Sequence, residues 1–415
     1  MAVVRKIFFF CSIVALILGC DNFSDDTPAL PDIKPFTKGE KVSRTLLVYL
    51  MAENNLTDYL DGDFSEVRLA AYDIPDDVRL FVYFDNSDAT RLPALYQYHP
   101  YNGKIVENVV YMFDTDVCSS DVNVLGKVLD VVFENYPTEA FDLIMGSHSD
   151  GWIRYQSKSA PSRALGVDNG KNDTSNDITK TIEIEELAEL LEQQPVKVDR
   201  LMFDACLMQG VEVAYALRNA ANWIIGSPAE IPAYGAPYDK MVPLFFDTAA
   251  GVDDIMYEYK KAYDNLDYAV VLSAVNTSYM QEFANSTSQN VKRYFGVDNT
   301  NDYSGCLAYL PDGVYTSDIK RYPSYYDINA VMKRVLADTD YAEWKAVLDK
   351  VVFYRMVSNS KKVYSDIINK YFDIYSDFVG LSMYLPRNRS KNEYFNELFR
   401  TTEWYTAAGW SEAGW

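Results

Sequence analysis

The sequence predicts an α/β fold built around a mostly parallel β-sheet with helices on both faces. Short, continuous apolar runs recur along the chain, as in strands that are buried on both faces. Segments with helical spacing separate these runs, which is the order expected of parallel strands joined by helices. Nearly half of the 415 residues (48%) are hydrophobic, which is enough for one large core.

The first half of the chain alternates predicted strands with predicted helices. Apolar runs predict buried strands at residues 45–50, 78–84, 141–145, 201–203 and 223–226. Residues 94–110 predict a hairpin with Asn102-Gly103 at its turn. Helical spacing predicts helices over residues 122–133, 184–191 and 213–217. The polar stretch 153–181 predicts a long loop, and the mixed pattern continues without a linker, so we expect one domain over residues 41–415.

The net charge of −22 limits the partners of this chain. Nucleic acid is a polyanion and would be repelled, so we expect no nucleic-acid partner. Electrostatic docking on anionic lipid is disfavoured for the same reason. The acidic surface is otherwise typical of a soluble protein.

The first twenty residues resemble the leader of an exported bacterial lipoprotein. Arg5 and Lys6 precede an apolar run at 7–18, which is too short to span a bilayer comfortably and has the proportions of a signal peptide. Residues 17–20 (Ile-Leu-Gly-Cys) resemble a lipobox, in which the cysteine is acylated and becomes the new N-terminus. We expect a signal peptide over residues 1–19 and a lipid on Cys20. An ordinary signal peptide cut elsewhere is the alternative.

Residues 20–40 predict a disordered stalk behind Cys20, because the segment is mostly polar and contains three prolines. Residues 24–26 (Ser-Asp-Asp) resemble a short acidic surface-export signal of bacterial lipoproteins. We therefore expect an exported protein that is anchored to the bacterial outer membrane through this lipid only. The sequence leaves exposure at the cell surface open.

Only two histidines are available for chemistry. His99 falls in the predicted hairpin tip, where we expect it to be solvated. His148 follows the strand at 141–145 in a turn of small residues, which lets a substrate backbone approach closely. The chain contains no Gly-x-Ser-x-Gly elbow and no His-Glu-x-x-His spacing, so a serine hydrolase and a metallopeptidase are disfavoured.

The five cysteines can be ranked by their predicted surroundings. Two lie in the leader, so three remain and at least one thiol is expected to be free. There is no Cys-x-x-Cys pair, so we expect no structural zinc site. Cys118 is predicted in a loop and Cys306 inside a strand, where a free cysteine usually serves as inert packing. Cys206 is predicted at a strand end near a helix start, where peptide N–H groups favour a thiolate.

His148 and Cys206 each follow a predicted strand end, so both belong on the same edge of the sheet. The segments that surround them resemble the clostripain family of cysteine peptidases, which is in the same broad clan as the caspases. The resemblance covers about residues 44–410, and its matching segments are 47–56, the strand into His148 with Gly151-Trp152, 203–208, 211–215, 227–238 and 380–386. It implies a caspase-like three-layer α/β/α sandwich.

The resemblance also implies the roles of the site residues. The Cys206 thiolate attacks a peptide carbonyl, and water hydrolyses the acyl-enzyme. His148 serves as the acid for the leaving amine and then as the base for water. Backbone N–H groups near Ser149 and Cys206 hold the oxyanion, and Asp204 lies beside the P1 pocket. The implied partner is a protein or peptide substrate, bound by a monomer with no certain cofactor.

Two positions depart from the family pattern. The family usually has glycine directly after the catalytic histidine, whereas this chain has Ser149. Family members that cut after arginine or lysine tend to carry an acidic residue where this chain has Tyr234. A basic P1 preference would therefore rest on Asp204 alone, and Asp204 as a helix cap or strand-end residue is the alternative.

The loop after His148 and the acidic residues in it leave two further points open. The resemblance to clostripain-like enzymes implies an activating cleavage in this interval. The bonds after Lys158 and Arg163 are the expected sites. A plain solvated loop is the alternative. Calcium is a possible cofactor, but the acidic stretch 168–177 lacks the spacing of a calcium loop.

Two other functions fit the same sequence. A catalytically weak peptide- or glycan-binding lipoprotein on this fold would suit the acidic, tyrosine-rich composition. The presence of both His148 and Cys206 favours the peptidase over this alternative. Transfer of the acyl group to an amine uses the same residues as hydrolysis, so the sequence does not separate the two reactions.

Overall fold

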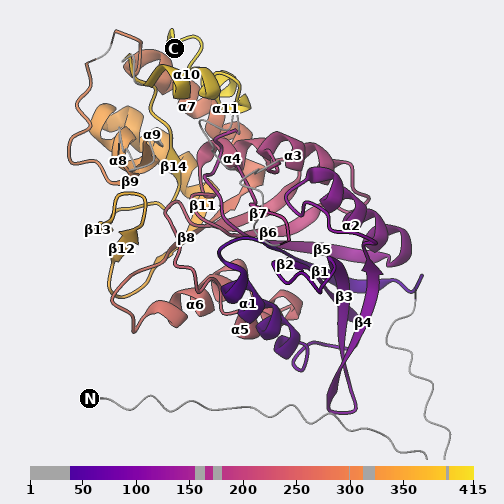
Figure 1. Ribbon diagram of the computed structural model, residues 1–415. Helices are drawn as coiled ribbons and strands as arrows, with labels where there is room; N and C mark the ends of the chain where they lie inside the picture. Colours follow the sequence, from indigo (N-terminus) through magenta and orange to yellow (C-terminus); the bar gives the residue numbers. More distant parts are fainter. Residues whose placement is uncertain (1–37, 155–163, 172–179, 299, 312–322, 389–391) are drawn as a thin grey trace, which may run out of the picture. The chain divides into compact units, whose positions relative to one another are not determined.

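A nine-stranded β-sheet forms the centre of the computed structural model (Figure 1). The structure describes residues 38–154, 164–171, 180–298, 300–311, 323–388 and 392–415. The strands of this sheet are β1 (Val42–Ala52), β2 (Val78–Asn86), β3 (Ala94–Tyr101), β4 (Lys104–Met112), β5 (Thr138–Gly146), β6 (Val198–Asp204), β7 (Ala221–Gly226), β8 (Val271–Asn276) and β11 (Val352–Val357).

The sheet has a parallel centre and antiparallel edges. Its strand order is β11-β8-β7-β6-β5-β1-β2-β3-β4. The strands β7, β6, β5, β1 and β2 pair in parallel, whereas β8 and β11 at one edge and β3 and β4 at the other pair antiparallel. The prediction of a mostly parallel sheet is therefore confirmed.

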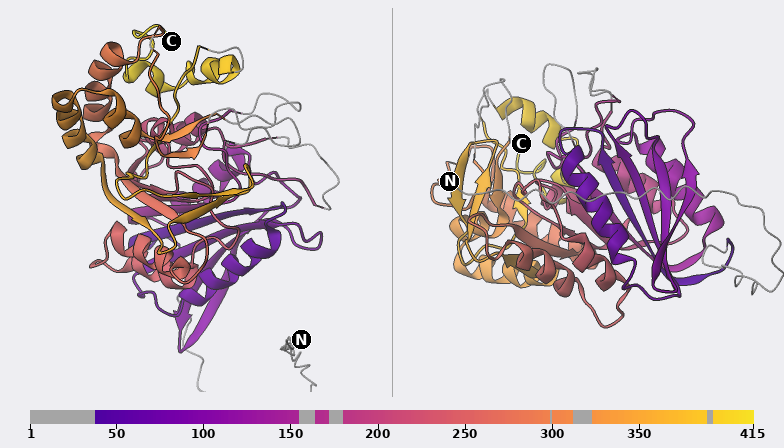
Figure 2. Two further views of the ribbon diagram at one scale, coloured as in Figure 1. Left: turned by 90° about the vertical axis from the view of Figure 1, so that its left-hand side faces the viewer. Right: turned by 60° about the horizontal axis from the view of Figure 1, so that its bottom comes forward.

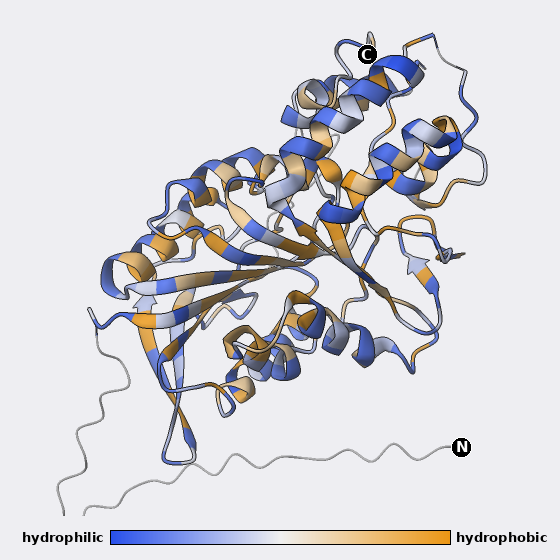
Figure 3. Ribbon diagram, turned by 180° about the vertical axis from the view of Figure 1, so that it is seen from behind, coloured by the Kyte–Doolittle hydropathy of each residue, from blue (hydrophilic) through white to orange (hydrophobic). Residues whose placement is uncertain are grey.

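Helices cover both faces of the sheet and give three layers (Figures 1 and 3). One face packs against α1 (Thr57–Ala70), α5 (Tyr238–Phe246) and α6 (Val252–Tyr263). The other packs against α2 (Val122–Asn135), α3 (Ile184–Glu192) and α4 (Val211–Ala216). Alternate side chains of β1 enter the two cores, Leu46 on one side and Leu47 on the other. This explains why β1 is a continuous apolar run.

The chain after β8 adds further helices and two small sheets. The helices are η1 (Thr277–Tyr279), α7 (Met280–Tyr294), α8 (Ile328–Val335), α9 (Asp338–Val351), α10 (Glu393–Phe399) and α11 (Glu403–Ala407). The small sheets contain β9 (Ala308–Leu310), β10 (Tyr325–Asp327) and β14 (Ser382–Met383), and β12 (Lys362–Ser365) with β13 (Lys370–Asp373). Figure 2 shows these elements, orange to yellow, at the end of the sheet away from the β3–β4 hairpin.

The C-terminal elements are joined to the sandwich close to α4. The N–H of Ser382 donates to the Gln209 carbonyl at 2.9 Å, and the N–H of Tyr384 donates to Glu212 Oε1 at 2.8 Å.

Phe36–Trp415 form one compact unit. No helix within the described ranges is both long and apolar enough to cross a membrane. Cys20 lies outside the described residues.

The structure confirms most predicted elements and corrects two local expectations. The hairpin turn is confirmed, because Asn102 and Gly103 have φ of 49° and 71° as a two-residue turn requires. His99 is not solvated: it pairs with Val106 inside the hairpin, and its side chain is only 13% exposed. This burial lowers the pKa of His99. Cys306 is not inside a strand but in a bend before β9.

Asp142 on β5 ties the three central strands together. Its carboxylate is fully buried and accepts four hydrogen bonds. Arg200 on β6 donates its backbone N–H (3.0 Å), Nε (2.9 Å) and Nη2 (2.6 Å), and Arg44 on β1 donates Nη1 (2.7 Å). A buried ion pair is tolerated only when its polar atoms are satisfied in this way.

We expect Asp142→Asn to lower the free energy of unfolding by about 3–5 kcal/mol, because it leaves the buried Arg200 guanidinium without its counter-charge. Urea unfolding measures the loss. Asp199→Asn is the matched control, since it removes the half-exposed carboxylate that also pairs with Arg44, and it should cost about 1 kcal/mol or less. Equal losses in the two variants would show that the central strands do not depend on Asp142.

Candidate active site

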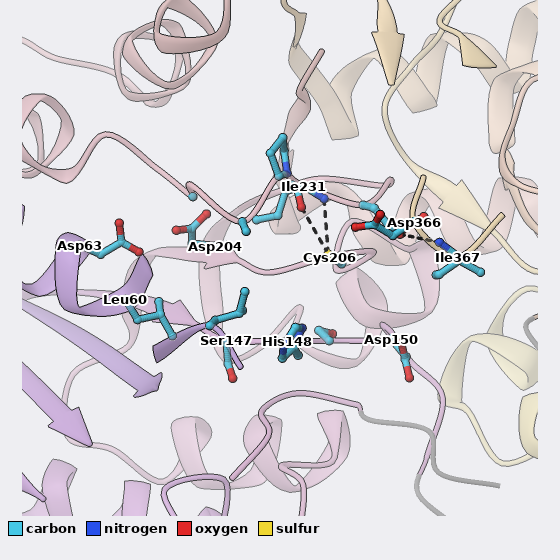
Figure 4. Close-up of a pocket in the computed structure, with 16 residues that line it drawn as sticks. Leu60, Asp63, Ser147, His148, Asp150, Asp204, Cys206, Ile231, Asp366 and Ile367 are labelled. Atoms are coloured by element: carbon cyan, nitrogen blue, oxygen red, sulfur yellow. Dashed lines mark hydrogen bonds between the residues drawn. The ribbon is translucent and has the colours of Figure 1, made fainter. Parts of the chain in front are cut away.

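The carboxyl ends of β5 and β6 bring His148 and Cys206 together. The two strands are parallel neighbours, and Gly146 lies opposite Asp204 at their ends. His148 and Cys206 each follow this pair by two residues, on strands spaced about 4.8 Å apart. Both line a single pocket of about 230 Å³ (Figure 4).

The two turns that carry these residues contact each other. Gly151 has a φ of 76°, and a Cβ at this position would lie 2.7 Å from the Leu207 carbonyl oxygen, so only glycine fits. Leu207, directly after Cys206, has a φ of 60°. For a residue with a Cβ this left-handed conformation costs about 1–2 kcal/mol, and such strain is commonly found at functional sites.

Asn55 holds the His148 imidazole from the segment between β1 and α1. His148 Nε2 lies 2.6 Å from Asn55 Oδ1. Nε2 therefore carries a proton and donates it to the amide oxygen, which makes Nδ1 the basic nitrogen of the neutral ring. Asn55 falls within the matched segment 47–56, but its spacing gave no sign that it pairs with His148.

Ser149 fixes the backbone that follows His148. Its buried hydroxyl donates to the Ala164 carbonyl at 2.5 Å and accepts the N–H of Gly151 at 3.0 Å. Serine in place of the usual glycine therefore gives up backbone freedom, but it adds hydrogen bonds that hold the turn.

The Cys206 thiol lies half-buried beside Ile231, whose N–H donates to Sγ at 3.4 Å. Burial raises the pKa of Cys206 to about 12, and the negative charge of Glu230 adds to this, whereas the Ile231 N–H acts in the opposite direction. The expected thiolate at a helix start is therefore corrected. The helix α4 begins only at Val211 and has six residues, so the thiol of the free protein is neutral and needs a base.

A late part of the chain closes the far side of the pocket. Glu230 accepts the N–H of Ile367 at 3.2 Å and the Ser365 hydroxyl, and so attaches the turn between β12 and β13 beside Cys206. Burial raises the pKa of Glu230 to about 7. Asp366 and Ile367 line the pocket at this end (Figure 4). The sequence carried no sign of this long-range contact.

Asp204 lines the opposite end of the pocket as the last residue of β6. It is buried, and it accepts hydrogen bonds from the Tyr259 hydroxyl (2.7 Å), the Ala236 N–H (3.0 Å) and the Tyr238 hydroxyl (3.1 Å). Burial raises the pKa of Asp204, and these three donors act in the opposite direction.

Asp63 on α1 is a second carboxylate at this end, and no sequence expectation included it. Burial raises its pKa, as do the nearby charges of Asp204 and Glu66. Asp63 lies on the helix face that buries Leu60 and Phe64. A lone carboxylate on the apolar face of a helix was therefore the sign that could have identified it.

Tyr234 does not itself line this pocket, although its chain neighbours Ala233 and Gly235 do. Its side chain is 67% exposed and packs edge-on against Tyr59, with 5.4 Å between the ring centroids. Lys158 and Arg163, the expected processing positions, lie outside the described residues.

A separate carboxylate cluster lies at the ends of β1 and β2. Within the described part of the chain, Glu53, Asp85 and Asp116 form the one acidic group whose oxygens are close enough together to hold a metal ion. The Lys171 ammonium lies 2.6 Å from Asp85 Oδ1 and 3.2 Å from Glu53 Oε1. Calcium needs six to eight oxygen ligands, so this cluster does not fit calcium while Lys171 is in place.

The sequence profile of the clostripain family matches residues 48–415. The chain belongs to the clostripain family. The family resemblance stated from the sequence is therefore confirmed, and so is the caspase-like three-layer fold, which is shared with solved structures of C11 cysteine proteases.

Individual relatives and solved structures differ in how much of this chain they match. Clostripain of Hathewaya histolytica is 29% identical over 227 residues, which cover 49% of this chain and 42% of clostripain, less than half of its length. A secreted C11 cysteine protease of Bacteroides thetaiotaomicron, solved with an irreversible peptide inhibitor, is 28% identical with a TM-score of 0.74, over 89% of this chain and 99% of that one. A cysteine protease of B. fragilis is 31% identical with a TM-score of 0.51, over 58% of this chain and 98% of that one.

We expect Asn55→Ala to lower kcat for peptide hydrolysis by about 10-fold or more, with little change in KM, because the His148 imidazole loses the acceptor that orients it. Asn55→Asp should restore most of the activity, since a carboxylate oxygen accepts the same hydrogen bond. Steady-state kinetics across pH compares the three proteins. An Asn55→Ala enzyme with unchanged kcat and pH profile would mean that His148 does not depend on this contact.

Proposed function

We propose that this protein is a cysteine endopeptidase that hydrolyses peptide bonds through a Cys206–His148 dyad and an acyl-enzyme. The register of β5 and β6 carries this proposal, because His148 and Cys206 follow neighbouring strand ends and both line one pocket. Membership of the clostripain family supports it, as does the peptide inhibitor bound to the Bacteroides thetaiotaomicron protease.

The chemistry follows from the neutral resting thiol. His148 Nδ1 accepts the Cys206 proton as sulfur attacks the substrate carbonyl, while Nε2–H stays bonded to Asn55. The backbone N–H groups of Ser149 and Cys206 would receive the negative oxygen. The tetrahedral intermediate collapses, and the leaving amine takes the proton from His148. Water then gives a proton to His148 and attacks the thioester, which releases the acid and restores the thiol.

We also propose that the protein is exported and held at the outer membrane by a lipid on Cys20. The basic residues, apolar run and lipobox-like ending of residues 1–20 support this location. The secreted state of the Bacteroides thetaiotaomicron relative supports export. A monomer whose stalk separates the peptidase from the bilayer would act on protein or peptide substrates outside the cell membrane.

We expect Cys206→Ala and His148→Ala each to lower kcat by at least about 10³-fold without unfolding the protein, since both residues act as one unit. Hydrolysis of a fluorogenic peptide library and thermal unfolding measure the two effects. Cys306→Ala is the control, because its sulfur lies 3.5 Å from the Ala330 carbonyl and does not line the pocket. A Cys206→Ala protein with full activity would remove the dyad mechanism.

We expect the mature N-terminus to be an acylated Cys20, as the lipobox-like residues 17–20 predict. Mass spectrometry of the protein extracted from its native membrane would detect the added acyl chains. Cys20→Ala should appear in the soluble fraction, because a lipid is the expected link to the bilayer. An unmodified N-terminus on the membrane-bound protein would exclude the lipid tether.

A further inference from the structure

Lys171 places a buried ammonium at the carboxyl ends of β1 and β2, outside the residues that line the catalytic pocket. Its side chain is only 11% exposed, and Nζ donates to Asp85 Oδ1 and to the Asn86 carbonyl, both at 2.6 Å. Nζ also lies 3.2 Å from Glu53 Oε1 and 3.7 Å from Asp116 Oδ1. A buried ammonium is tolerated only when oxygens surround it in this way, so these contacts constrain where the chain lies.

The charge of Lys171 balances that of Asp85. No other cation of the described residues pairs with the carboxylates around the ammonium. Burial raises the pKa of Asp85 to about 7, and the Lys171 charge acts in the opposite direction. Burial raises the pKa of Glu53 to about 9, and the nearby Asp168 carboxylate acts in the same direction. Just above pH 7, therefore, Glu53 is neutral and the buried ion pair is that of Lys171 with Asp85.

Lys171 ends a segment, residues 164–171, that lies along the turn carrying His148. The Gly166 N–H donates to the His148 carbonyl at 2.9 Å, and the Val167 N–H donates to the Ser147 hydroxyl at 3.3 Å. The first half of the segment thus holds the His148 turn, while the Lys171 ammonium fixes its last residue to β2.

Glu53 gives Lys171 a second connection to the imidazole. Glu53 lies two residues before Asn55, whose Oδ1 accepts the hydrogen bond from His148 Nε2 at 2.6 Å. The Glu53 carbonyl also accepts the N–H of Asn169 at 2.8 Å. The segment that carries Asn55 and the segment 164–171 are therefore joined through their backbones and through one ammonium.

We propose that Lys171 is a positioning residue of the peptidase: its ammonium holds together the two segments that orient the His148 imidazole. One is the segment 164–171, which hydrogen-bonds to residues 147 and 148, and the other carries Glu53 and Asn55. Lys171 does not line the pocket, so its effect reaches the reaction through the position of the ring. The inference rests on the proposed peptidase function and adds a requirement for a cation outside the pocket.

Lys171→Met tests this requirement, because it keeps the length of the side chain and removes the charge. We expect it to lower kcat for the fluorogenic peptide that the wild type cleaves best by about 10–100-fold, the scale of a misplaced reacting group, with KM changed by less than about twofold. Kinetics are measured well below the Tm of each protein. Lys180→Met is the matched control, since this lysine pairs with Asp121 but is 54% exposed, and it should change neither constant.

Chemical rescue separates the charge from the packing of the side chain. Lys171→Ala removes Cγ, Cδ, Cε and Nζ, which are the heavy atoms of propylammonium, and should lose kcat as Lys171→Met does. Added propylammonium chloride should raise the kcat of Lys171→Ala by about fivefold or more, with saturation. Sodium chloride at the same ionic strength and 1-propanol should not. Lys171→Met should not respond, because its side chain fills the space.

Three kinetic results would overturn the inference. A folded Lys171→Met protein with the kcat of the wild type would show that the ammonium does not position His148. A loss confined to KM would place the effect on substrate binding. A loss in Lys171→Ala that propylammonium leaves unchanged would assign the effect to packing. Failure of the peptidase function itself is distinct, because the wild type would then cleave no peptide or Cys206→Ala would remain active.

Thermal unfolding across pH checks the ion pair independently. Both proteins should lose stability from about pH 4 upward, because the unfolded state ionises Asp85 first. This loss ends near pH 7 in the wild type and should continue in Lys171→Met, whose Asp85 has no counter-charge. The Tm deficit of Lys171→Met should therefore be larger at about pH 8 than at about pH 6. The other titratable groups near Asp85 are Glu53, Asp116, Asp168, Tyr49 and Tyr83.

A Tm deficit that is the same at both pH values would contradict the pairing of Lys171 with Asp85. If Lys171→Met does not fold, Asp85→Asn replaces it in the kinetic comparison, because it removes the charge of the same pair and keeps an oxygen acceptor for the ammonium. Asp85→Asn should then lower kcat with little change in KM, and an unchanged kcat would overturn the inference.

Discussion

The buried carboxylate of Asp142 is the interaction on which the geometry of the site depends. It joins β5 to β6 and β1 through two arginines, Arg200 and Arg44, and so fixes the register of three central strands. A shift of one residue between β5 and β6 would send every side chain of one strand to the opposite face. His148 and Cys206 would then no longer flank the same pocket. A polar contact in the body of the sheet thus sets the alignment of groups at its edge.

The edge of the sheet combines a rigid backbone with a thiol that is kept in its neutral form. The turns that contain Gly151 and Leu207 pack closely against each other. The left-handed backbone conformation of Leu207 is strained. Within this frame the Cys206 thiol stays neutral, because burial and the nearby Glu230 both disfavour the thiolate. In the proposed mechanism, the thiol would therefore lose its proton as the sulfur attacks the substrate carbonyl, and not before.

Periodicity and strand-end position predicted the layers and the His148–Cys206 pair, because strands buried on both faces appear as apolar runs and parallel strands end at one edge. The helix α1 escaped prediction, since Thr57–Ala70 contains four acidic residues and an internal glycine that obscure its apolar face. Asp63 was missed with it. Asn55 and the pocket wall at Ile367 depend on contacts between distant segments, and the pKa of Cys206 depends on burial, so none of these follows from local sequence.

The late position of the pocket wall has a consequence for folding. Residues up to the end of β7 already include the thiol, the imidazole and the parallel core. The turn at Ile367 and the support that Ser382 and Tyr384 give to α4 come more than 130 residues later. The chain therefore has both reactive groups before the residues that complete the cleft. Loss of the C-terminal third would leave the thiol and the imidazole on an intact parallel core but without the wall that closes the pocket beside them.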